Sequence, residues 1–556
     1  MLGEHDLHTN DPIEALFPVP AGLSCLPPDL FDTKGCTQGG YPVYVVNVTT
    51  VKHIQLAIKF ARDTGVRLIV KNTGHDCSGK SSGAGALSIW THHLKDIEYI
   101  ANYTVLGYTG PAFKVGAGVQ GFEIYEAAHA HGLRAVGGVC PTVGTFGGYS
   151  QAAGHSLLGS LHGLGVDQIL ELNVVTPDGE FLTASPDKNE DLFWAIRGGG
   201  GSTFGVVTSM VVRAHKDATT TSAVIEWGVT ENNITVDTFW LGVTAYHARF
   251  PEWTAAGTTS HWNLMPTGAF PDVAPPGAAP PDGQPLFSVT PFMAPGKTVV
   301  ELKTLLTPWL EEMSSFGINV NITYTQFDSY VEALAAAFPH GPDTLGNAHY
   351  SYGSRLLPRS SSDPKTGLNK TIAALRYLSE TGHMFDAYHI GPTLEVAKPI
   401  APLAVLPAWR DALSHLLVFV QWSPNATAAE QLATRDKFTN HYMQVLRDAT
   451  PGSGSYMNEA DREEPDFQTA FYGDSYKRLL EIKRAYDPDD VFWAATAVGS
   501  EGWAVQSVDG LPTENAGLYK EHREKQKRTK GGTKSERGGD NSHREFYFVI
   551  ASGMLS

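Results

Sequence analysis

Three glycine-rich stretches in the first 215 residues place the strongest constraint on how this chain folds. They begin at Gly74 ("GHDCSGKSSGAGA"), at Gly137 ("GGVCPTVGTFGGYSQAAGHS") and at Arg197 ("RGGGGSTFG"). Glycine has no Cβ, so these runs interrupt helices and strands and form turns whose backbone amides can approach a ligand closely. We therefore expect one α/β region with three turns that can cradle a ligand such as a pyrophosphate.

The string "GHDCSGKS" (74–81) matches the phosphate-binding loop pattern G-x-x-x-x-G-K-[ST]. A P-loop leads from a strand into a helix. The apolar run "VRLIV" (66–70) precedes the string, but "SGAGALSIW" (82–90) follows it and predicts a turn and a strand. Asp76 would also place a negative charge inside the phosphate cradle. We therefore reject a nucleoside triphosphate site and assign Lys80 no role in one.

The third stretch fails as a dinucleotide fingerprint. In G-x-G-x-x-G the last glycine follows the second by three residues, and that position falls on Thr203 or Phe204. The sequence that follows, "VVTSMVVRAH", is rich in β-branched residues and predicts a strand where the fingerprint requires a helix. A Rossmann site is rejected as well.

The net charge and the cysteines indicate which binding partners and which metal sites the protein lacks. The net charge of −17 argues against nucleic acid or an anionic membrane as a partner, and no run approaches the roughly 20 apolar residues of a membrane span. The four cysteines form no zinc-type spacing, so we predict no metal site. Cys25 and Cys36 are spaced to close a small surface loop as a disulfide.

Six N-x-[ST] sequons favour the secretory pathway or secretion. They stand at Asn47, Asn102, Asn233, Asn321, Asn369 and Asn425. A signal peptide has a basic stretch followed by an apolar one, and the first residues of this sequence do not show that pattern.

Two reactive side chains lie in the turns: His75 in the first and Cys140 in the second. Histidine and cysteine are well suited to covalent attachment at neutral pH. The alternative for a single histidine in a glycine-rich loop is a hydrogen-bonding or capping role, and from the residues alone both interpretations stay open.

Four longer stretches together resemble the FAD-linked oxidoreductases of the berberine bridge enzyme-like group, within the vanillyl-alcohol oxidase superfamily. They are "KNTGHDCSGKSSGAGALSIWTHHLKDI", "GGVCPTVGTFGGYSQAAGHS", "DLFWAIRGGGGSTFGVVT" and "FYGDSYKRLLEIKRAYDPDDVFW…GSEGW". They keep the family's order and spacing over residues 37–506. The resemblance is closest to a fungal branch whose members often serve secondary metabolism or oxidise small alcohols.

The resemblance implies an α+β fold, in which a PCMH-type two-subdomain FAD-binding domain joins an α+β substrate domain with an antiparallel sheet. Within it we expect a helix with Ile54, Ala57, Ile58 and Ala61 on its buried face, ended by Gly65. The boundaries we predict are an N-terminal extension (1–36), the FAD-binding domain (37–215), the substrate domain (216–450), a C-terminal berberine-bridge-like segment that returns to the FAD domain (451–506), and a disordered tail (507–556).

For the cofactor, the resemblance implies FAD held covalently, by His75 through the flavin 8α-methyl group and by Cys140 through the flavin C6. The residues on the pyrophosphate side would be Gly74, Asp76, Ser78, Gly79 and Ser81. Those along the rest of the cofactor would be Gly144, Gly147, Gly148, Gly154 and Asn458, with Gly205 and Val207 near the adenosine end. Cys77 departs from the family, which usually has a bulkier residue there.

For catalysis, several relatives carry a Y-x-N-Y motif whose last tyrosine removes the substrate proton. The string here is "YMNE", so Tyr456 and Asn458 match while Glu459 stands in place of that tyrosine. A carboxylate can also act as the base if it is within hydrogen-bond reach of the substrate, and we expect burial to raise its pKa toward the working pH. Substrate contacts are expected from Tyr350, Tyr352 and His389.

The resemblance therefore implies a monomeric oxidoreductase that abstracts a hydride from a C–OH or C–NH carbon of a small molecule, with O₂ as acceptor, in fungal secondary metabolism. Three alternatives stay open: an oxidase of simple alcohols or carbohydrates, a dehydrogenase with another acceptor, and a flavin-binding protein with impaired turnover.

Overall fold

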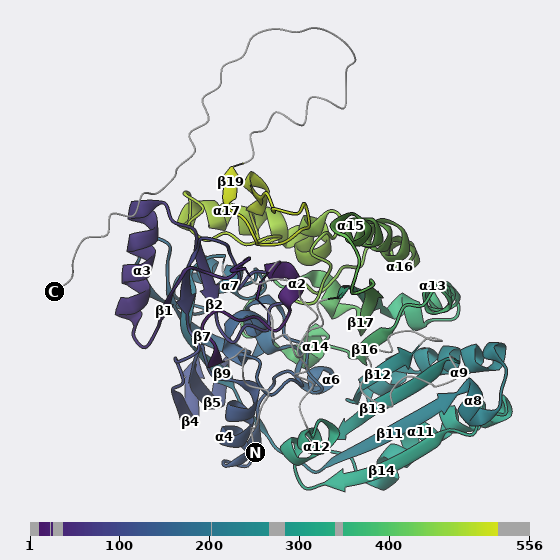
Figure 1. Ribbon diagram of the computed structural model, residues 1–556. Coiled ribbons are helices and arrows are strands. Elements are labelled where there is room, and N and C mark those ends of the chain that lie inside the picture. Colours follow the sequence, from purple (N-terminus) through teal and green to yellow (C-terminus); the bar gives the residue numbers. More distant parts are fainter. Residues whose placement is uncertain are drawn as a thin grey trace.

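The fold is α+β, as expected, and is seen in a computed structural model (Figure 1). The structure describes residues 10–22, 24–25, 37–201, 203–265, 284–339 and 349–520. Two smaller sheets lie on one side of the molecule and a large antiparallel sheet on the other. Helices of the C-terminal part lie across both sides (Figure 1).

The first small sheet is parallel, in the order β1-β3-β2. Its strands are β1 (Tyr44–Asn47), β2 (Leu68–Lys71) and β3 (Leu87–Trp90). Helix α3 (Val51–Thr64) buries the four predicted apolar residues, and Gly65 ends it at φ +70°, a left-handed conformation that glycine adopts without strain. Because β3 follows the glycine–lysine string, the predicted turn and strand are confirmed and a P-loop is excluded.

The second small sheet is antiparallel, in the order β4-β5-β9-β7-β8. Its strands are β4 (Ile97–Val105), β5 (Tyr108–Gly116), β7 (Ile169–Val175), β8 (Phe181–Ala184) and β9 (Val206–Arg213). The longer helices beside it are α4 (Gly121–His129), α7 (Glu190–Ile196) and α17 (Tyr476–Tyr486). Strand β9 begins directly after the third glycine-rich stretch, as its β-branched sequence predicted.

The large sheet has seven antiparallel strands in the order β14-β11-β13-β12-β16-β17-β15. They are β11 (Thr220–Gly228), β12 (Thr259–Met265), β13 (Leu286–Pro295), β14 (Asn321–Phe327), β15 (Tyr350–Pro358), β16 (Phe385–His389) and β17 (Ala412–Gln421). The main helices of this part are α9 (Val236–Ala248), α11 (Val299–Ser315), α12 (Tyr330–Ala337), α13 (Leu368–Glu380), α15 (Ala428–Lys437) and α16 (Met443–Ala449). The core of this part is aromatic, since Trp227, Trp253, Trp262 and Trp309 are all fully buried.

Three arginines, of which Arg197 and Arg213 are buried and Arg410 is half-buried, hold the two sides together. Arg410 binds Asp167 through two hydrogen bonds of 2.9 and 2.6 Å, and the Asp167 side chain is fully buried. Arg197 donates to the carbonyl of Pro402 at 2.5 Å, and Arg213 donates to that of Lys398 at 2.8 Å. Because these donors come from elements far apart in the sequence, they fix how the two sides meet.

The start of the chain packs against the first glycine-rich turn. The N–H of Leu16 donates to the carbonyl of Gly74 at 2.9 Å, just before the short helix α2 (Pro18–Ala21). Figure 1 shows α2 between the two sides of the molecule. Cys25 is disulfide-bonded, and its predicted partner Cys36 lies outside the residues that the structure describes.

The disorder expected from residue 507 onward does not hold for residues 507–520. Strand β19 (Leu518–Lys520) pairs with β18 (Trp503–Val505), and the Glu514 side chain is buried between Arg67 and Arg462. Local composition could not reveal these ion pairs, because both arginines lie elsewhere in the chain. The rest of the expected tail, 521–556, lies outside the described residues, as does most of the predicted loop at 266–285. In the part of the chain that the structure covers, no helix is long and apolar enough to cross a membrane.

The Asp167–Arg410 pair should therefore matter to stability. We expect Arg410→Ala to lower the free energy of unfolding by about 3–5 kcal/mol, because it leaves the buried Asp167 carboxylate without its partner. The matched control is Arg376→Ala, which removes an exposed arginine paired with Asp237 and Glu380 and should cost at most about 1 kcal/mol. Urea unfolding followed by fluorescence measures both, and equal losses would contradict the role of the buried pair.

Candidate active site

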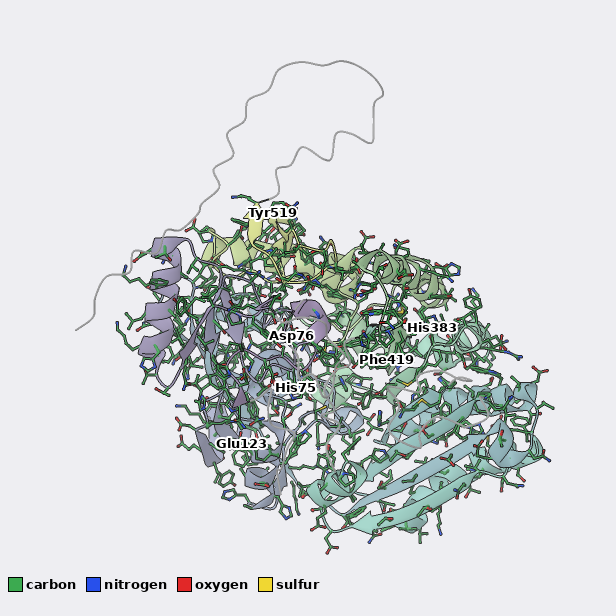
Figure 2. All side chains as sticks on the ribbon, in the orientation of Figure 1. His75, Asp76, Glu123, His383, Phe419 and Tyr519 are labelled. Atoms are coloured by element: carbon green, nitrogen blue, oxygen red, sulfur yellow. The ribbon has the colours of Figure 1, made fainter. Side chains whose placement is uncertain are left out.

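The first and second glycine-rich turns meet at His75. Its Nε2 shares a hydrogen bond of 2.6 Å with the hydroxyl of Thr142, two residues after Cys140. Burial, helped by the charge of Lys71, lowers the pKa of His75 to about 3, so the imidazole is neutral at physiological pH. Figure 2 labels His75 and Asp76 near the middle of the view, and both residues are half-buried. A neutral imidazole nitrogen is the form that can act as a nucleophile.

The turn that carries His75 is shaped by Asp76. Its carboxylate accepts hydrogen bonds from the N–H and hydroxyl of Ser78, at 3.3 and 3.2 Å, and from the N–H of Ser81 at 3.2 Å. Gly74 and Gly79 both have positive φ, +82° and +88°, which a side chain would strain. The predicted residues of this turn are thus brought together, with Asp76 closing the turn itself.

The second turn packs against Asn72. A Cβ at Gly144 would come within 2.2 Å of the Asn72 side chain, and one at Gly147 within 2.6 Å. A Cβ at Gly148 would meet nothing within 4 Å, and the Gly148 carbonyl accepts a hydrogen bond of 3.1 Å from Asn458. The Asn72 side chain thus packs closely on Gly144 and Gly147, whereas the space beside Gly148 is open. A cofactor that lies along the turn would need such open space.

The implied FAD fits the groups that are present. In the part of the chain that the structure describes, the backbone N–H groups of Gly79 and Lys80 donate to no other residue, and the buried Asn72 Oδ1 accepts no hydrogen bond. Free amides in a tight turn suit a phosphate, and a buried acceptor without a donor calls for a partner. Of the two covalent candidates, His75 and Cys140, the cysteine is a thiol and not part of a disulfide, and it is half-buried.

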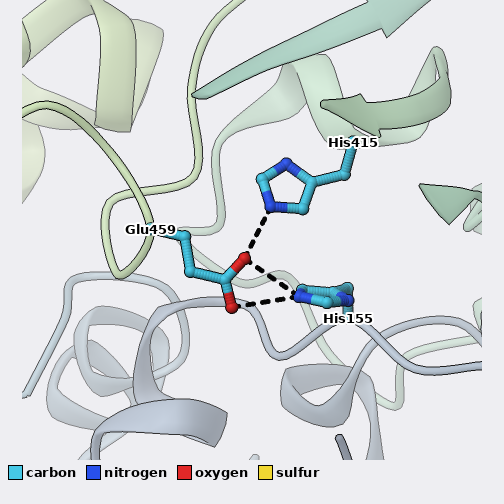
Figure 3. Close-up of side chains that lie close together, drawn as sticks. All are labelled: His155, His415 and Glu459. Atoms are coloured by element: carbon cyan, nitrogen blue, oxygen red, sulfur yellow. Dashed lines mark hydrogen bonds and ion pairs between the residues drawn. The ribbon is translucent and has the colours of Figure 1, made fainter. Parts of the chain in front are cut away.

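A carboxylate held between two histidines lies next to the second turn. His155 Nε2 is 3.1 Å from both carboxylate oxygens of Glu459, and His415 Nε2 is 2.7 Å from Oε2 (Figure 3). His155 follows the second turn, His415 lies on β17, and Glu459 lies in the C-terminal segment. The cluster therefore joins three separate parts of the chain.

The expected rise in the pKa of Glu459 is wrong, because the electrostatics of the cluster keep this carboxylate ionised. Burial alone would raise its pKa, but attraction and hydrogen bonds from His155 and His415 outweigh burial and hold the pKa well below its usual range. Burial in turn lowers the pKa of His415. The Glu459 side chain is 28% exposed, whereas those of His155 and His415 are 8% and 0% exposed. Only the carboxylate is thus open to a ligand to any extent.

Tyr456 forms hydrogen bonds with two residues next to the histidine–carboxylate cluster. Its hydroxyl accepts hydrogen bonds from the N–H of Gly154 at 3.2 Å and from Asn458 Nδ2 at 3.0 Å. Burial raises the pKa of Tyr456 far above its usual value, with the charge of Glu459 adding to the effect. Tyr456 therefore stays a neutral phenol that positions the turn and Asn458, and it is a poor proton acceptor.

Some predicted residues lie away from this cluster. Gly205 directly precedes β9, and a Cβ there would meet the Val175 carbonyl at 2.6 Å. Val207 lies on β9 and pairs with Val174 in the five-stranded sheet. His389 is fully buried and bonds to Ser260 and to the carbonyl of Thr258, so it is a packing residue. Tyr350 and Tyr352 on β15 line a pocket that also includes Cys77.

The two histidines of the cluster were not predicted. His155 stands at the end of the glycine-rich stretch that begins at Gly137. His415 is the only ionisable residue in the apolar string "LSHLLVFV", and this was the one available signal. The atoms that these histidines and Glu459 could offer to a metal lie within 4.8 Å of one another, a grouping that the sequence could not show. In this structure the same atoms satisfy one another through hydrogen bonds.

Comparisons with known proteins place these residues in a family context. Two family models match the chain, "FAD binding domain" over residues 42–185 and "Berberine and berberine like" over residues 455–499. The FAD-linked oxidoreductase patO of Aspergillus clavatus is 39% identical over 475 residues, which are 85% of this chain and 79% of patO. The bifunctional decalin synthase calF of Penicillium decumbens is 38% identical over 499 residues, 89% of this chain and 82% of calF. The crystal structure of the VAO-type flavoprotein MtVAO615 from Myceliophthora thermophila C1 matches with a TM-score of 0.81 and 35% identity, covering 92% of this chain and 88% of that one.

The lowered pKa of Glu459 has a consequence for stability. A carboxyl whose pKa is depressed by folding stabilises the protein above its ordinary pKa, near 4.5, and loses that contribution as the pH falls toward the lowered value. We expect wild type to be more stable than Glu459→Gln by a constant margin above about pH 5, and this margin to shrink on acidification below about pH 4. His415→Leu removes one hydrogen-bond donor to the carboxylate. The stability margin between this variant and its Glu459→Gln double variant should therefore begin to shrink at a higher pH. Urea unfolding at a series of pH values tests this, and a margin independent of pH would contradict it.

Proposed function

Because the chain belongs to the FAD-linked oxidoreductases of the berberine bridge enzyme-like group, within the vanillyl-alcohol oxidase superfamily, we propose that it is an oxidase that takes a hydride from a C–OH or C–NH carbon of a small organic substrate. The observation that carries this proposal is the partly exposed carboxylate of Glu459, fixed between His155 and His415 beside the turn that follows Cys140. It offers a proton acceptor next to the groups that suit a flavin.

In this proposal Glu459 accepts the hydroxyl or amine proton of the substrate. The two histidine N–H groups fix the carboxylate in one orientation, and Tyr456 and Asn458 hold the turn from which it projects. When bound, FAD supplies the acceptor for the hydride, and O₂ takes the two electrons and leaves as H₂O₂. The substrate loses one hydride and one proton in total and becomes a carbonyl or an imine.

We also propose that FAD is bound through two covalent bonds, from His75 to the 8α-methyl group and from Cys140 Sγ to C6. Each bond replaces one hydrogen of the flavin and one of the side chain, and the two electrons released with each bond pass to O₂. The contact of 2.6 Å between His75 and Thr142, close to Cys140, supports attachment of one cofactor by both turns. The low pKa of His75 supports the histidine as a nucleophile.

We infer that the natural substrate is an intermediate of fungal secondary metabolism. The similarity to patO and to the decalin synthase calF supports this class of substrate. We further propose passage through the secretory pathway, because the asparagines of all six sequons are exposed where glycosylation could reach them.

Covalent attachment is tested on protein precipitated with acid. We expect flavin to remain in the pellet of wild type, and mass mapping to place it on peptides containing His75 and Cys140. His75→Ala and Cys140→Ala should each leave one bond, whereas the double variant should release all of its flavin. The control is Cys77→Ser, because Cys77 is a free thiol that is not expected to bond to flavin. Colourless wild-type protein, grown with flavin available, would contradict the proposal.

The role of Glu459 is tested by flavin reduction under anaerobic conditions with a substrate found by screening for H₂O₂. We expect Glu459→Gln to slow reduction by about 10²- to 10⁴-fold, the usual range for loss of a general base. Glu98→Gln, at an exposed position on β4, is the matched control and should reduce at the wild-type rate. If Glu459→Gln reduces as fast as wild type, another group accepts the proton.

A further inference from the structure

The six sequons divide into two groups of three by their place in the fold. Three of them lie on strands: Asn47 on β1, Asn102 on β4 and Asn321 on β14. The other three lie outside strands: Asn233 directly after the short helix α8 (Val229–Asn232), Asn369 on helix α13, and Asn425 in the loop between β17 and α15. The first group is the subject of this inference.

Each of the three strands is the outer edge of a different sheet. Strand β1 is at the edge of the three-stranded sheet, β4 at that of the five-stranded sheet, and β14 at that of the seven-stranded sheet. Their partners are β3, β5 and β11, and no strand among the described residues pairs with their other sides. Figure 1 shows β14 along the lower margin of the large sheet. The inner strands of these sheets carry no sequon.

These edge strands lack the residues that usually protect an edge. An edge strand presents unpaired N–H and C=O groups to other chains, and proteins commonly place lysine or proline there to prevent edge-to-edge pairing. The three strands contain no lysine, arginine or proline, and Glu98 on β4 is their single charged residue. Strand β14, "NITYTQF", is uncharged and rich in β-forming residues, which is typical of segments that aggregate.

The opposite edge of the large sheet is protected by the chain itself. On β15 the N–H of Leu356 donates to the carbonyl of Gly454 at 2.8 Å, and the Ser455 hydroxyl donates to the carbonyl of Ser354 at 2.6 Å. The C-terminal segment thus covers this edge, and β15 carries no sequon. In the large sheet the sequon therefore stands on the edge that the C-terminal segment leaves uncovered.

The three edge sequons are accessible to modification. The asparagines are exposed, and so are the threonines that complete the sequons, Thr49, Thr104 and Thr323. An N-linked glycan is bulky and hydrated, so on an edge strand it keeps a second strand at a distance. The disulfide bond of Cys25 agrees with an oxidising compartment, where such glycans are added.

We propose that Asn47, Asn102 and Asn321 carry N-linked glycans that shield the outer edges of the three sheets and so keep folded copies of the chain from associating edge to edge. This inference rests on the proposed passage through the secretory pathway and is independent of the oxidase chemistry. In the modification, the asparagine amide nitrogen loses a proton and bonds to C1 of the first sugar. The bond between that sugar and the diphosphate of its lipid carrier breaks, so no oxidant or reductant is needed.

The first test compares two triple variants of the full chain, secreted from a fungal host. Mass mapping of the wild type should find glycans on the three edge asparagines. One variant changes these three to Gln, and the matched control changes Asn233, Asn369 and Asn425 to Gln, so both lose three sequons. By light scattering at equal concentration, we expect the edge variant to aggregate at least tenfold faster than wild type and the control to stay within twofold. Both should keep the wild-type midpoint of urea unfolding.

A second test separates protection of the edge from the general solubility that a sugar gives. Thr323→Ala and Thr323→Lys both abolish the sequon at Asn321, but only the second places a charge on the edge of β14. We expect Thr323→Ala to aggregate faster than wild type, and Thr323→Lys to aggregate as slowly as wild type although it lacks the same glycan.

Three results would overturn the inference: edge asparagines without glycans in a protein glycosylated elsewhere, equal aggregation of the two triple variants, or aggregation of Thr323→Lys as fast as that of Thr323→Ala. Absence of glycans from all six sites would contradict the secretory passage as well. If the glycans and the aggregation are as expected but the protein holds no flavin, the edge inference stands and the proposed oxidase is wrong.

Discussion

The candidate site depends most on the hydrogen bonds that fix Glu459 between His155 and His415. A carboxylate in this position would be costly to bury alone, because burial disfavours its charge. The two histidine N–H groups reverse that balance, and they come from the turn after Cys140 and from strand β17. The same contacts thus keep the carboxylate ionised, fix its direction, and hold together the three segments whose meeting forms the site.

A second group of charges fixes the first glycine-rich turn from outside. Glu514 is buried between Arg67 and Arg462, and Arg462 also donates to the carbonyl of Ser78 within that turn. The N–H of Leu16 binds the same turn from the start of the chain. Both flanking segments therefore contribute to the site.

Much of the fold could be predicted from the sequence because the signals were local. The helical spacing of Ile54, Ala57, Ile58 and Ala61 with Gly65 after it predicted helix α3, and the β-branched run after the third glycine-rich stretch predicted β9. The distinction from a P-loop also needed only the neighbouring residues. The family was predictable from motifs in a fixed order, and the relatives confirm it.

The centre of the site could be predicted only in part, because its contacts are distant in sequence. His155 and His415 are 304 and 44 residues from Glu459, and no spacing rule links them. Residues 507–520 were predicted to be disordered for the same reason, because their structure depends on ion pairs from Glu514 to Arg67 and Arg462, which lie elsewhere in the sequence. His389 shows the opposite error: a polar residue in a strand looked available but satisfies its hydrogen bonds within the core.

The most direct measurement is a crystal structure of the flavin-loaded protein. We expect electron density that is continuous from the flavin ring to both His75 and Cys140, with the reactive centre of the ring facing the Glu459 carboxylate and both histidine contacts kept. A flavin bound elsewhere, or a Glu459 carboxylate turned away from it, would contradict the proposed active site.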